Sequence, residues 1–337
     1  MGSHLVSKLL DSNHEVYGLI RRQSESRIPS RLKENIENPN LHIVTGDITD
    51  YYSIIKFLNL SQPDIIFHLA SQSFVPDSMN NPLSTYDTTL NGTLLTLEAI
   101  RNVCGNDTKL VFAGSSEEYG QQFDSFKDWT DFVEQYGGVF PEPIKYPETP
   151  INEDNILRPQ SPYAVAKCAS DFACRNYYQT YGLKTIVSRA FNHEGANRGH
   201  HFVTASIVRQ AVECKLGESK AIRIGNTDSK RDWSHVDDIV DAYILLGYKG
   251  HVGEVYVSGS GKQYSIQDFI NMTIDKLGIS PYIYIEESLK RKTDVTNLMA
   301  DPTKIKQLGW SPQKQILDVI EDLTHYYLVP QHRKNIL

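Results

Sequence analysis

Tyr163 and Lys167 have the types and the spacing for acid–base chemistry. Pro162, directly before the tyrosine, suits the first turn of a helix, and residues four positions apart lie on one helical face. An ammonium group near a phenol favours the phenolate and lowers its pKa from about 10. Tyr163 could therefore act as a general base, with Lys167 as the cation that favours its charged form.

A second tyrosine–lysine pair with the same spacing is Tyr52 and Lys56. The chain contains 19 tyrosines, so that one chance match to so short a pattern is expected. The pair follows the loop 46–50 rather than the Ser161-Pro162 start that precedes Tyr163. We interpret Tyr52 and Lys56 as an accidental match.

A second group of reactive side chains lies in the octapeptide 113–120, directly after an apolar run. Ligands of α/β proteins bind where parallel strands end, so that this segment is a candidate site. Ser115 could hydrogen-bond both a substrate hydroxyl and Tyr163, and Glu117 could remove a second proton. The alternative is structural, because serines and acidic residues after a strand often cap a helix.

The N-terminal segment resembles the second half of a βαβ unit. Apolar residues recur at helical spacing in 2–10, and the short apolar run 15–20 ends in Arg21-Arg22. In a dinucleotide-binding fingerprint, the residue that meets the adenosine ribose follows the last glycine by roughly 20 positions, which is the separation of Gly2 and Arg21. Arginines there favour the 2′-phosphate of NADP, although a surface basic pair is the alternative. We therefore expect that the chain starts in mid-motif, with the first strand and most of the Gly-rich loop missing.

Composition narrows the function class. The chain has 337 residues, 40% of them hydrophobic and 22% charged, with a net charge of −7. These values are typical of a globular protein, and the acidic balance argues against nucleic-acid or anionic-membrane partners. No apolar stretch approaches membrane-spanning length and no signal-peptide pattern is present, so that we expect a cytoplasmic protein. No His/Cys pattern indicates a metal site.

Strand-like and helix-like segments alternate through the first half. Alternation of this kind predicts parallel strands with helical crossovers. The expected strands are 15–20, 41–45, 64–69, 109–113 and 185–189, and the clearest helices are 90–103 and 164–181.

We therefore expect an α/β fold with a Rossmann-type doubly wound parallel sheet. Residues 1–190 would form the NADP-binding domain. An aromatic- and proline-rich insertion at 121–159, with its own short helix, could serve as a lid or an oligomer contact. Residues 191–337 would mainly form a smaller mixed α/β substrate lobe, from which about 231–260 return to the first domain.

Together these stretches resemble a known family, the extended short-chain dehydrogenase/reductases that modify nucleotide sugars, and within it the GDP-mannose 4,6-dehydratases. The resemblance runs from Gly2 to about Tyr327 and is interrupted mainly at 121–159. It is carried by Gly2, Arg21-Arg22, Gly46-Asp47, His68-Leu69-Ala70, Ser115-Ser116-Glu117, Tyr119-Gly120, Ser161-Pro162-Tyr163, Lys167, Phe191-Asn192-His193-Glu194, Arg198-Gly199, Phe202-Val203-Thr204, Gly225-Asn226, Lys230-Arg231-Asp232-Trp233 and His235.

The resemblance implies a redox-neutral dehydration. Tyr163, assisted by Lys167 and Ser115, would take the proton of the sugar 4-hydroxyl while C4 is oxidised by NADP. Glu117 would then remove the C5 proton and assist loss of the C6 hydroxyl, before the hydride returns to C6. The product of such a reaction on GDP-mannose is GDP-4-keto-6-deoxymannose.

The resemblance also assigns binding residues. The implied cofactor-binding residues are Gly2, Arg21, Arg22, Asp47, Ile48, Leu69, Ala70, Ser71, Tyr163, Lys167, His193 and Arg198. The implied substrate-binding residues are Ser73, Ser116, Asn192, Phe202, Val203, Arg231 and Arg291. Without the family, Arg231 beside Asp232 could equally be a surface ion pair of little energetic value.

Three alternatives to the dehydratase remain at this level. A reductase acting on GDP-4-keto-6-deoxymannose can carry a similar octapeptide, and a nucleotide-sugar 4-epimerase shares the tyrosine and lysine but needs no base at Glu117. A truncated nucleotide-sugar-binding protein without activity is the non-enzymatic alternative. The family resemblance further implies a homodimer or homotetramer that binds a GDP-sugar as its small-molecule substrate.

Overall fold

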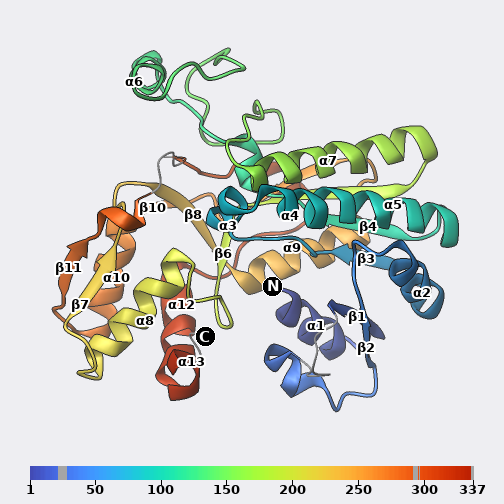
Figure 1. The fold of residues 1–337 in the computed structure, drawn as a ribbon, viewed down its shortest axis with the longest axis horizontal. Coiled ribbons are helices and arrows are strands. Elements are labelled where there is room, and N and C mark those ends of the chain that lie inside the picture. The colour runs from blue at the N-terminus through green and yellow to red at the C-terminus, as the bar shows by residue number, and fades with distance from the viewer. Residues whose placement is uncertain (22–28, 291–294, 296, 335–337) are drawn as a thin grey trace. The chain divides into compact units, whose positions relative to one another are not determined.

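A computed structural model describes residues 1–21, 29–290, 295 and 297–334. The chain divides into two compact units. Unit 1 comprises 1–118, 159–189 and 240–256, and unit 2 comprises 119–158, 190–239 and 257–337. Figure 1 shows the elements of both. No helix of the described residues is long and apolar enough to cross a membrane.

Unit 1 is built on parallel strands, as the sequence predicts. β1 (Val16–Arg21) pairs with β2 (Leu41–Gly46) in one sheet. A second sheet has the order β3-β4-β5-β9, with the bounds Ile65–His68, Lys109–Ala113, Lys184–Ala190 and Val255–Ser258. All five strands expected from the sequence are present within one or two residues. The neighbours β3, β4 and β5 are parallel, so that their carboxyl ends share one edge.

Helices connect these strands, which confirms the Rossmann-type α/β fold class. Two of them, α5 and α7, lie side by side against the sheet (Figure 1). The helices of this unit are α1 (Gly2–Asp11), η1 (Ser30–Asn35), α2 (Tyr51–Ser61), α3 (Val75–Asn80), α4 (Pro82–Tyr86), the π-helix η2 (Asp87–Asn91), α5 (Gly92–Val103), η3 (Ser116–Tyr119), α7 (Pro162–Tyr181) and α9 (Val236–Lys249), of which η3 ends and α9 begins in unit 2.

Local sequence explains where α7 begins and ends. The hydroxyl of Ser161 accepts a hydrogen bond from Ala164 N at 3.0 Å, which caps the helix. Pro162 occupies the first turn, where a missing N–H costs nothing. Gly182 ends the helix in the left-handed conformation, with φ of 72°. Apolar residues of α5, β4, β5 and α7 form the core beneath it, including Leu97, Phe112 and Cys174.

Unit 2 is a mixed α/β structure. Its three-stranded sheet has β8 (Lys230–His235) in the middle, parallel to β6 (Asn192–Glu194) and antiparallel to β10 (Gln263–Ser265). The strands β7 (Ala221–Ile224) and β11 (Tyr282–Ile285) form a parallel pair. The helices are α6 (Phe126–Tyr136), α8 (Val203–Lys215), α10 (Ile266–Leu277), η4 (Glu287–Leu289), α11 (Thr303–Gln307), α12 (Ile316–Leu328) and α13 (Pro330–Lys334).

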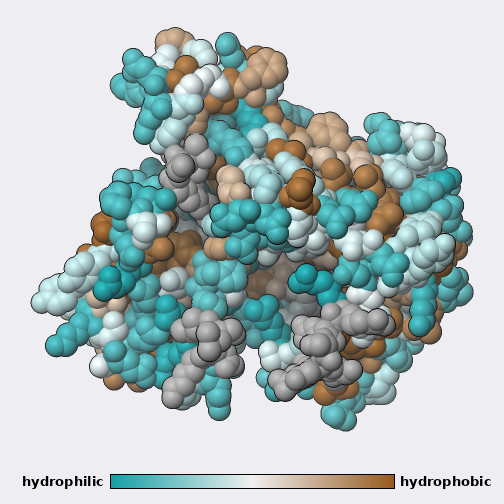
Figure 2. All heavy atoms as spheres, in the orientation of Figure 1, coloured by the Kyte–Doolittle hydropathy of each residue, from teal (hydrophilic) through white to brown (hydrophobic). Residues whose placement is uncertain are grey.

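Side chains of α8, α10 and α12 pack around Trp233 of β8 and form the main core of unit 2. The segment 119–158 also belongs to this unit and contains the expected short helix, α6. No side chain of α6 is fully buried, and the helix stands apart from the other helices of its unit in Figure 1. Hydrophobic residues lie at the surface of this segment in Figure 2, consistent with the exposure of Phe126, Phe140 and Ile144.

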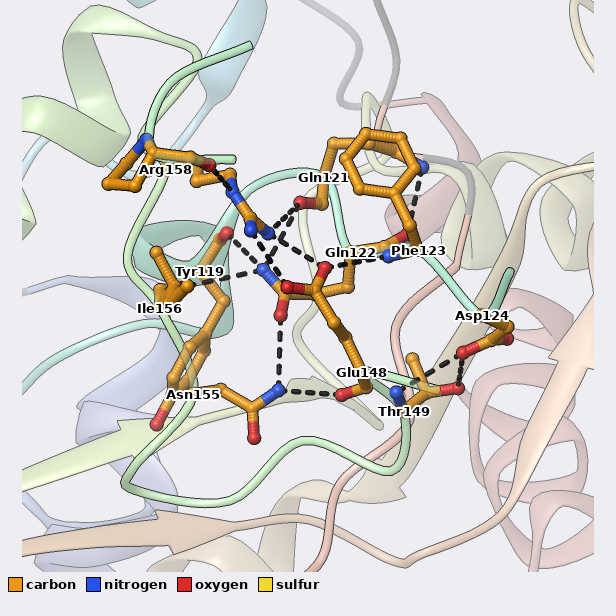
Figure 3. Close-up of polar contacts among 11 residues, drawn as sticks. Tyr119, Gln121, Gln122, Phe123, Asp124, Glu148, Thr149, Asn155, Ile156 and Arg158 are labelled. Carbon is orange, nitrogen blue, oxygen red and sulfur yellow. Dashed lines mark hydrogen bonds and ion pairs between the residues drawn. The ribbon is translucent and has the colours of Figure 1, made fainter. Parts of the chain in front are cut away.

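The base of this segment is held by a buried ion pair that the sequence did not reveal. Arg158 donates through NH1 and NH2 to the two carboxylate oxygens of Glu148, at 2.8 and 2.7 Å. It also donates to the carbonyl oxygens of Gln121 at 3.1 Å and Pro141 at 2.5 Å. Figure 3 shows the Arg158 guanidinium and the Glu148 carboxylate facing each other, with Gln121 beside them. We call these four residues the Arg158 clamp, because they join both ends of the segment.

Candidate active site

The loop after β4 places the first candidate residues. Ser115 and Ser116 are buried, whereas Glu117 is only partly buried. The hydroxyl oxygen of Ser115 accepts a hydrogen bond from Glu117 N at 3.2 Å. Ser115 N in turn donates to the Glu118 side chain at 2.7 Å. The loop is therefore fixed by its own side chains and still gives Glu117 access to the surface.

Helix α7 brings Lys167 to the same strand end. Its buried Nζ donates to the carbonyl oxygen of Ala113, the last residue of β4, at 2.6 Å. Nζ also lies 6.0 Å from the ring centroid of Tyr163 and 4.9 Å from that of Phe112. Burial lowers the pKa of Lys167 to about 8, and the Glu118 carboxylate acts in the opposite direction. The structure thus places Lys167 at the strand end that precedes the loop with Ser115 and Glu117, and the Tyr163 ring lies near the same ammonium group.

The second tyrosine–lysine pair, Tyr52 and Lys56, lies at the surface. Tyr52 is 81% exposed on α2, and Lys56 is one turn further along. Asp50, directly before α2, caps this helix by accepting a hydrogen bond from Tyr52 N at 3.1 Å.

The residues after β3 lie at the same edge of the sheet. Leu69 and Ser71 are partly buried, and Ala70 and Ser73 are exposed. The Ser71 hydroxyl is 2.9 Å from that of Thr89. His68, the last residue of β3, is buried and lies 3.1 Å from the Thr93 hydroxyl. Burial, with the charge of Lys167, lowers the pKa of His68 to about 3, so that this imidazole is neutral.

The ends of β1 and β2 hold the residues expected near the adenosine ribose. Arg21 ends β1 and is exposed, and its register partner is Gly46 of β2. Asp47 Oδ1 accepts from Thr49 N at 2.9 Å and from Thr49 Oγ1 at 2.8 Å. These bonds, with the charge of Arg21, lower the pKa of Asp47, although its partial burial opposes them. Ile48 is buried, while Arg22 lies outside the described residues.

Gly2, at the start of α1, lies near Leu69, the residue that follows β3. A Cβ at this position would be 3.9 Å from Leu69 Cδ1, which is ordinary van der Waals contact. The candidate cofactor residues of unit 1 therefore follow the carboxyl ends of β1, β2 and β3 or contact them. The carboxyl ends of parallel strands are where α/β proteins bind their ligands.

Unit 2 holds the other candidate binding residues. Asn192 and His193 lie on β6, opposite Trp233 and Ser234 of β8. The side-chain oxygen of Asn192 is buried and has no hydrogen-bond partner among the described residues. His193 Nδ1 lies 2.9 Å from the carbonyl oxygen of Phe191.

Arg198 forms an ion pair within unit 2. Its Nε lies 3.0 Å from Glu194 Oε2, and its guanidinium carbon lies 3.4 Å from the ring centroid of Phe202. Thr204 Oγ1 donates to the same buried carboxylate at 2.7 Å. Burial raises the pKa of Glu194, and the charge of Arg198 opposes the shift. Phe202 caps α8, and Val203 is its first residue.

The surface ion pair considered for Arg231 is wrong. Both Arg231 and Asp232 are buried. Asp232 accepts hydrogen bonds from Ser260 N, Ser260 Oγ, Gly261 N and Ala300 N, at 2.6 to 3.2 Å. Its carboxylate therefore holds loops of unit 2 together. Arg231 NH1 donates to Lys230 O at 3.0 Å, and Arg291 lies outside the described residues.

Within the part of the chain that the structure describes, no group of three or more His, Cys, Asp or Glu side chains could hold a metal ion. Sequence reasoning missed a further buried carboxyl group, that of Glu118, which accepts a hydrogen bond from Ser115 N in the loop after β4. The adjacent pair Glu117-Glu118 after a strand was its only signal.

Comparison with known proteins identifies the family of this chain. Residues 1–259 match the model of the NAD dependent epimerase/dehydratase family. GDP-mannose 4,6 dehydratase 2 of Arabidopsis thaliana is 31% identical over 324 residues, which cover 93% of this chain and 80% of that protein. This identity supports the resemblance inferred from the motifs.

Solved structures share the fold. A dTDP-glucose 4,6-dehydratase from Bacillus anthracis, in complex with NAD, has a TM-score of 0.78 and 22% identity, covering 98% of this chain and 94% of that one. RMD from Pseudomonas aeruginosa, complexed with NADPH, has a TM-score of 0.72 and 24% identity, covering 88% and 92%. Both matches confirm the Rossmann-type fold.

Proposed function

The chain belongs to the NAD dependent epimerase/dehydratase family, and on that premise we propose that it is an NADP-dependent GDP-mannose 4,6-dehydratase. The observation that carries the proposal is the arrangement at the end of β4. Glu117 is accessible on the same loop as Ser115, and the Lys167 ammonium lies against the strand end beside Tyr163. Two bases near one site suit a reaction that removes protons from neighbouring sugar carbons.

Tyr163 and Lys167 would perform the first proton transfer. Lys167 holds its ammonium near the Tyr163 ring by donating to Ala113 O, and this charge favours the phenolate. Tyr163 would accept the proton of the sugar 4-hydroxyl, to which Ser115 would hydrogen-bond. Bound NADP would supply the hydride acceptor for C4 and later the hydride for C6.

Glu117 would perform the elimination. Oxidation at C4 acidifies the C5–H bond, because the carbanion formed there is stabilised by the neighbouring ketone. Glu117 would remove that proton and protonate the departing C6 hydroxyl, so that water leaves. A plain alcohol oxidation or a 4-epimerisation needs no base at this position, and the presence of Glu117 therefore favours the dehydratase.

The cofactor preference rests on the end of β1. Family membership supports a nicotinamide cofactor, and Gly2, Leu69 and Ile48 suit its binding at the strand ends of unit 1. The exposed guanidinium of Arg21, with Arg22 next in sequence, suits the 2′-phosphate of NADP.

Substrate assignment draws on the relatives and on unit 2. The curated relative above is named for GDP-mannose. Asn192 offers a buried side-chain oxygen that could accept from a ligand, and Arg231 carries a positive charge that suits a diphosphate. Phe202 and Val203, at the start of α8, would complete the contacts to the sugar nucleotide.

Incubation with GDP-mannose and catalytic NADP⁺, followed by mass spectrometry of the sugar nucleotide, tests the proposal. We expect loss of water, about 18 Da, without net formation of NADPH. E117Q should lower the rate of water loss by at least about 100-fold. Unchanged GDP-mannose would overturn the proposal, and stoichiometric NADPH consumption with GDP-4-keto-6-deoxymannose would identify the reductase instead.

A further inference from the structure

Glu118 differs from its neighbour Glu117 in being fully buried. Its Oε1 accepts a hydrogen bond from Ser115 N at 2.7 Å, which closes the turn that carries Ser115 and Glu117. Ser115 then orients the next link, because its hydroxyl accepts from Glu117 N at 3.2 Å. The carboxyl of Glu118 is thus joined through two hydrogen bonds to the backbone of the proposed base.

Gly114 makes room for this carboxyl. A Cβ at that position would lie 2.8 Å from Glu118 Oε1 and 3.0 Å from Ser188 O. These separations are too short for any side chain other than hydrogen. Glycine at position 114 therefore leaves the space that the Glu118 carboxyl group occupies.

Two further charged residues, Arg189 and Asp171, lie close to Glu118. Arg189 Nε of β5 lies 3.4 Å from Glu118 Oε2 and 2.8 Å from Asp171 Oδ2. Asp171 is also fully buried, and its Oδ1 lies 2.6 Å from Arg175 Nε. Burial, followed by the charge of Asp171, raises the pKa of Glu118 to about 8, while Arg189 acts in the opposite direction. At neutral pH Glu118 is therefore mostly the neutral acid, whose carbonyl oxygen still accepts from Ser115 N.

Asp171 lies one helical turn after Lys167 on α7. Lys167 fixes Ala113 O, at the start of the turn. Asp171 forms an ion pair with Arg189, and Arg189 in turn contacts Glu118 at the end of the turn. One face of α7 thus contacts both ends of the segment 113–118.

We propose that Glu118 is a positioning residue, which holds the Ser115–Glu117 turn in place for proton abstraction by linking it to Asp171 and Arg189. Glu118 does not touch the substrate in this scheme and acts only through Ser115 and Glu117. The inference rests on the proposed function for its kinetic consequence, but not for its structural one. Loss of the acceptor at position 118 should release the Ser115 amide even in a protein without substrate.

The test compares E118Q and E118M with wild type in two assays. E118Q keeps an acceptor oxygen and the length of the neutral acid, whereas E118M keeps the length and removes the acceptor. Hydrogen exchange of the Ser115 amide, resolved by electron-transfer fragmentation, reports the hydrogen bond without any substrate. Steady-state kinetics of GDP-mannose dehydration separates kcat from KM.

For E118M we expect at least about tenfold faster exchange at Ser115. Its kcat should fall by about 30-fold or more, with KM within about threefold of wild type, because misplacement of a catalytic base affects the chemical step. E118Q should restore both values to within about threefold. As the matched control, E117Q should lose activity while Ser115 exchange stays at the wild-type rate.

Unchanged Ser115 exchange in E118M would overturn the positioning role, and so would unchanged kcat in an enzyme active on GDP-mannose. If wild type itself does not dehydrate GDP-mannose, the proposed function fails and the exchange comparison still decides the structural link. If E118M does not fold, E118A replaces it, because alanine also removes the acceptor oxygen and adds no atom to the buried site. Wild-type exchange at Ser115 in E118A would likewise overturn the proposal.

Discussion

Replacement of Arg158 by methionine removes the cation of the Arg158 clamp and leaves its carboxylate in place. The Arg158 and Glu148 side chains are 1% and 6% exposed, so that water can solvate neither charge. After the substitution, the donor left to the Glu148 carboxylate among the contacts drawn in Figure 3 is Phe123 N, at 2.9 Å. The carbonyl oxygens of Gln121 and Pro141 would also lose a charged donor.

The magnitude follows from the burial of the pair. Removal of one partner of a buried ion pair costs about 3–5 kcal/mol, because the other charge stays buried and uncompensated. Removal of both charges avoids that penalty, so that R158M/E148L should be less destabilised than R158M and E148L added together. We expect a coupling free energy of about 2 kcal/mol or more between the two positions.

Urea unfolding followed by tryptophan fluorescence measures this effect. The chain has 3 tryptophans, Trp129, Trp233 and Trp310, and all lie in unit 2 with the clamp. R209M is the matched control, because Arg209 pairs with Glu213 at side-chain exposures of 19% and 20%. That pair should contribute about 1 kcal/mol or less.

Two results would refute this reasoning. A loss of less than about 1 kcal/mol in R158M would mean that Glu148 finds another partner or solvent. Additive effects in the double variant would mean that the two side chains do not stabilise each other. Either result would remove the energetic basis for the clamp.

Three further predictions concern single residues. G120A should lower the free energy of unfolding by about 2–4 kcal/mol in the urea assay, because φ is +56° and the Cβ would lie 1.8 Å from Arg158 O. K167M should lower kcat for GDP-mannose dehydration by about 100-fold or more, because the ammonium near Tyr163 is lost. Glu118 binds its proton more tightly when folded, with a pKa of about 8 against the ordinary 4.5. Wild-type stability should therefore fall by up to about 1.4 kcal/mol per unit between pH 5 and 8 relative to E118Q, in urea unfolding followed by circular dichroism. An equal pH dependence in E118Q would contradict this assignment, in which Asp171 and Arg189 face the titrating group.

The sequence predicted those parts of the fold that depend on local signals. Ser161, Pro162 and Gly182 mark the bounds of α7 by their own backbone and capping preferences. The apolar run that forms β4 likewise needed no distant partner for its prediction. Tyr163 and Lys167 could be placed together for the same reason, since helical spacing alone puts them on one face.

Local signals could not distinguish Glu117 from Glu118. The two carboxylates are adjacent in sequence, and their different burial depends on Gly114 and on Arg189, which is distant along the chain. The Arg158 clamp escaped prediction for the same reason, because the path of the segment 119–158 determines which acidic residue reaches the guanidinium. Arg231 and Asp232 were compatible with a surface pair until tertiary contacts of Asp232 were known.

The protonation of Glu118 also explains how a carboxyl group can lie close to the proposed active site without cancelling the positive charge of Lys167. In the proposed mechanism, the phenolate of Tyr163 would depend on the positive charge of Lys167, and an ionised carboxylate nearby would partly cancel that charge. Burial raises the pKa of Glu118 and lowers that of Lys167, both to about 8. Near pH 7 the lysine is therefore mostly charged while Glu118 is mostly neutral. Glu118 can then hold Ser115 N through its carbonyl oxygen and leave the field at Tyr163 positive, which is why glutamine at position 118 should serve where an ionised group would not.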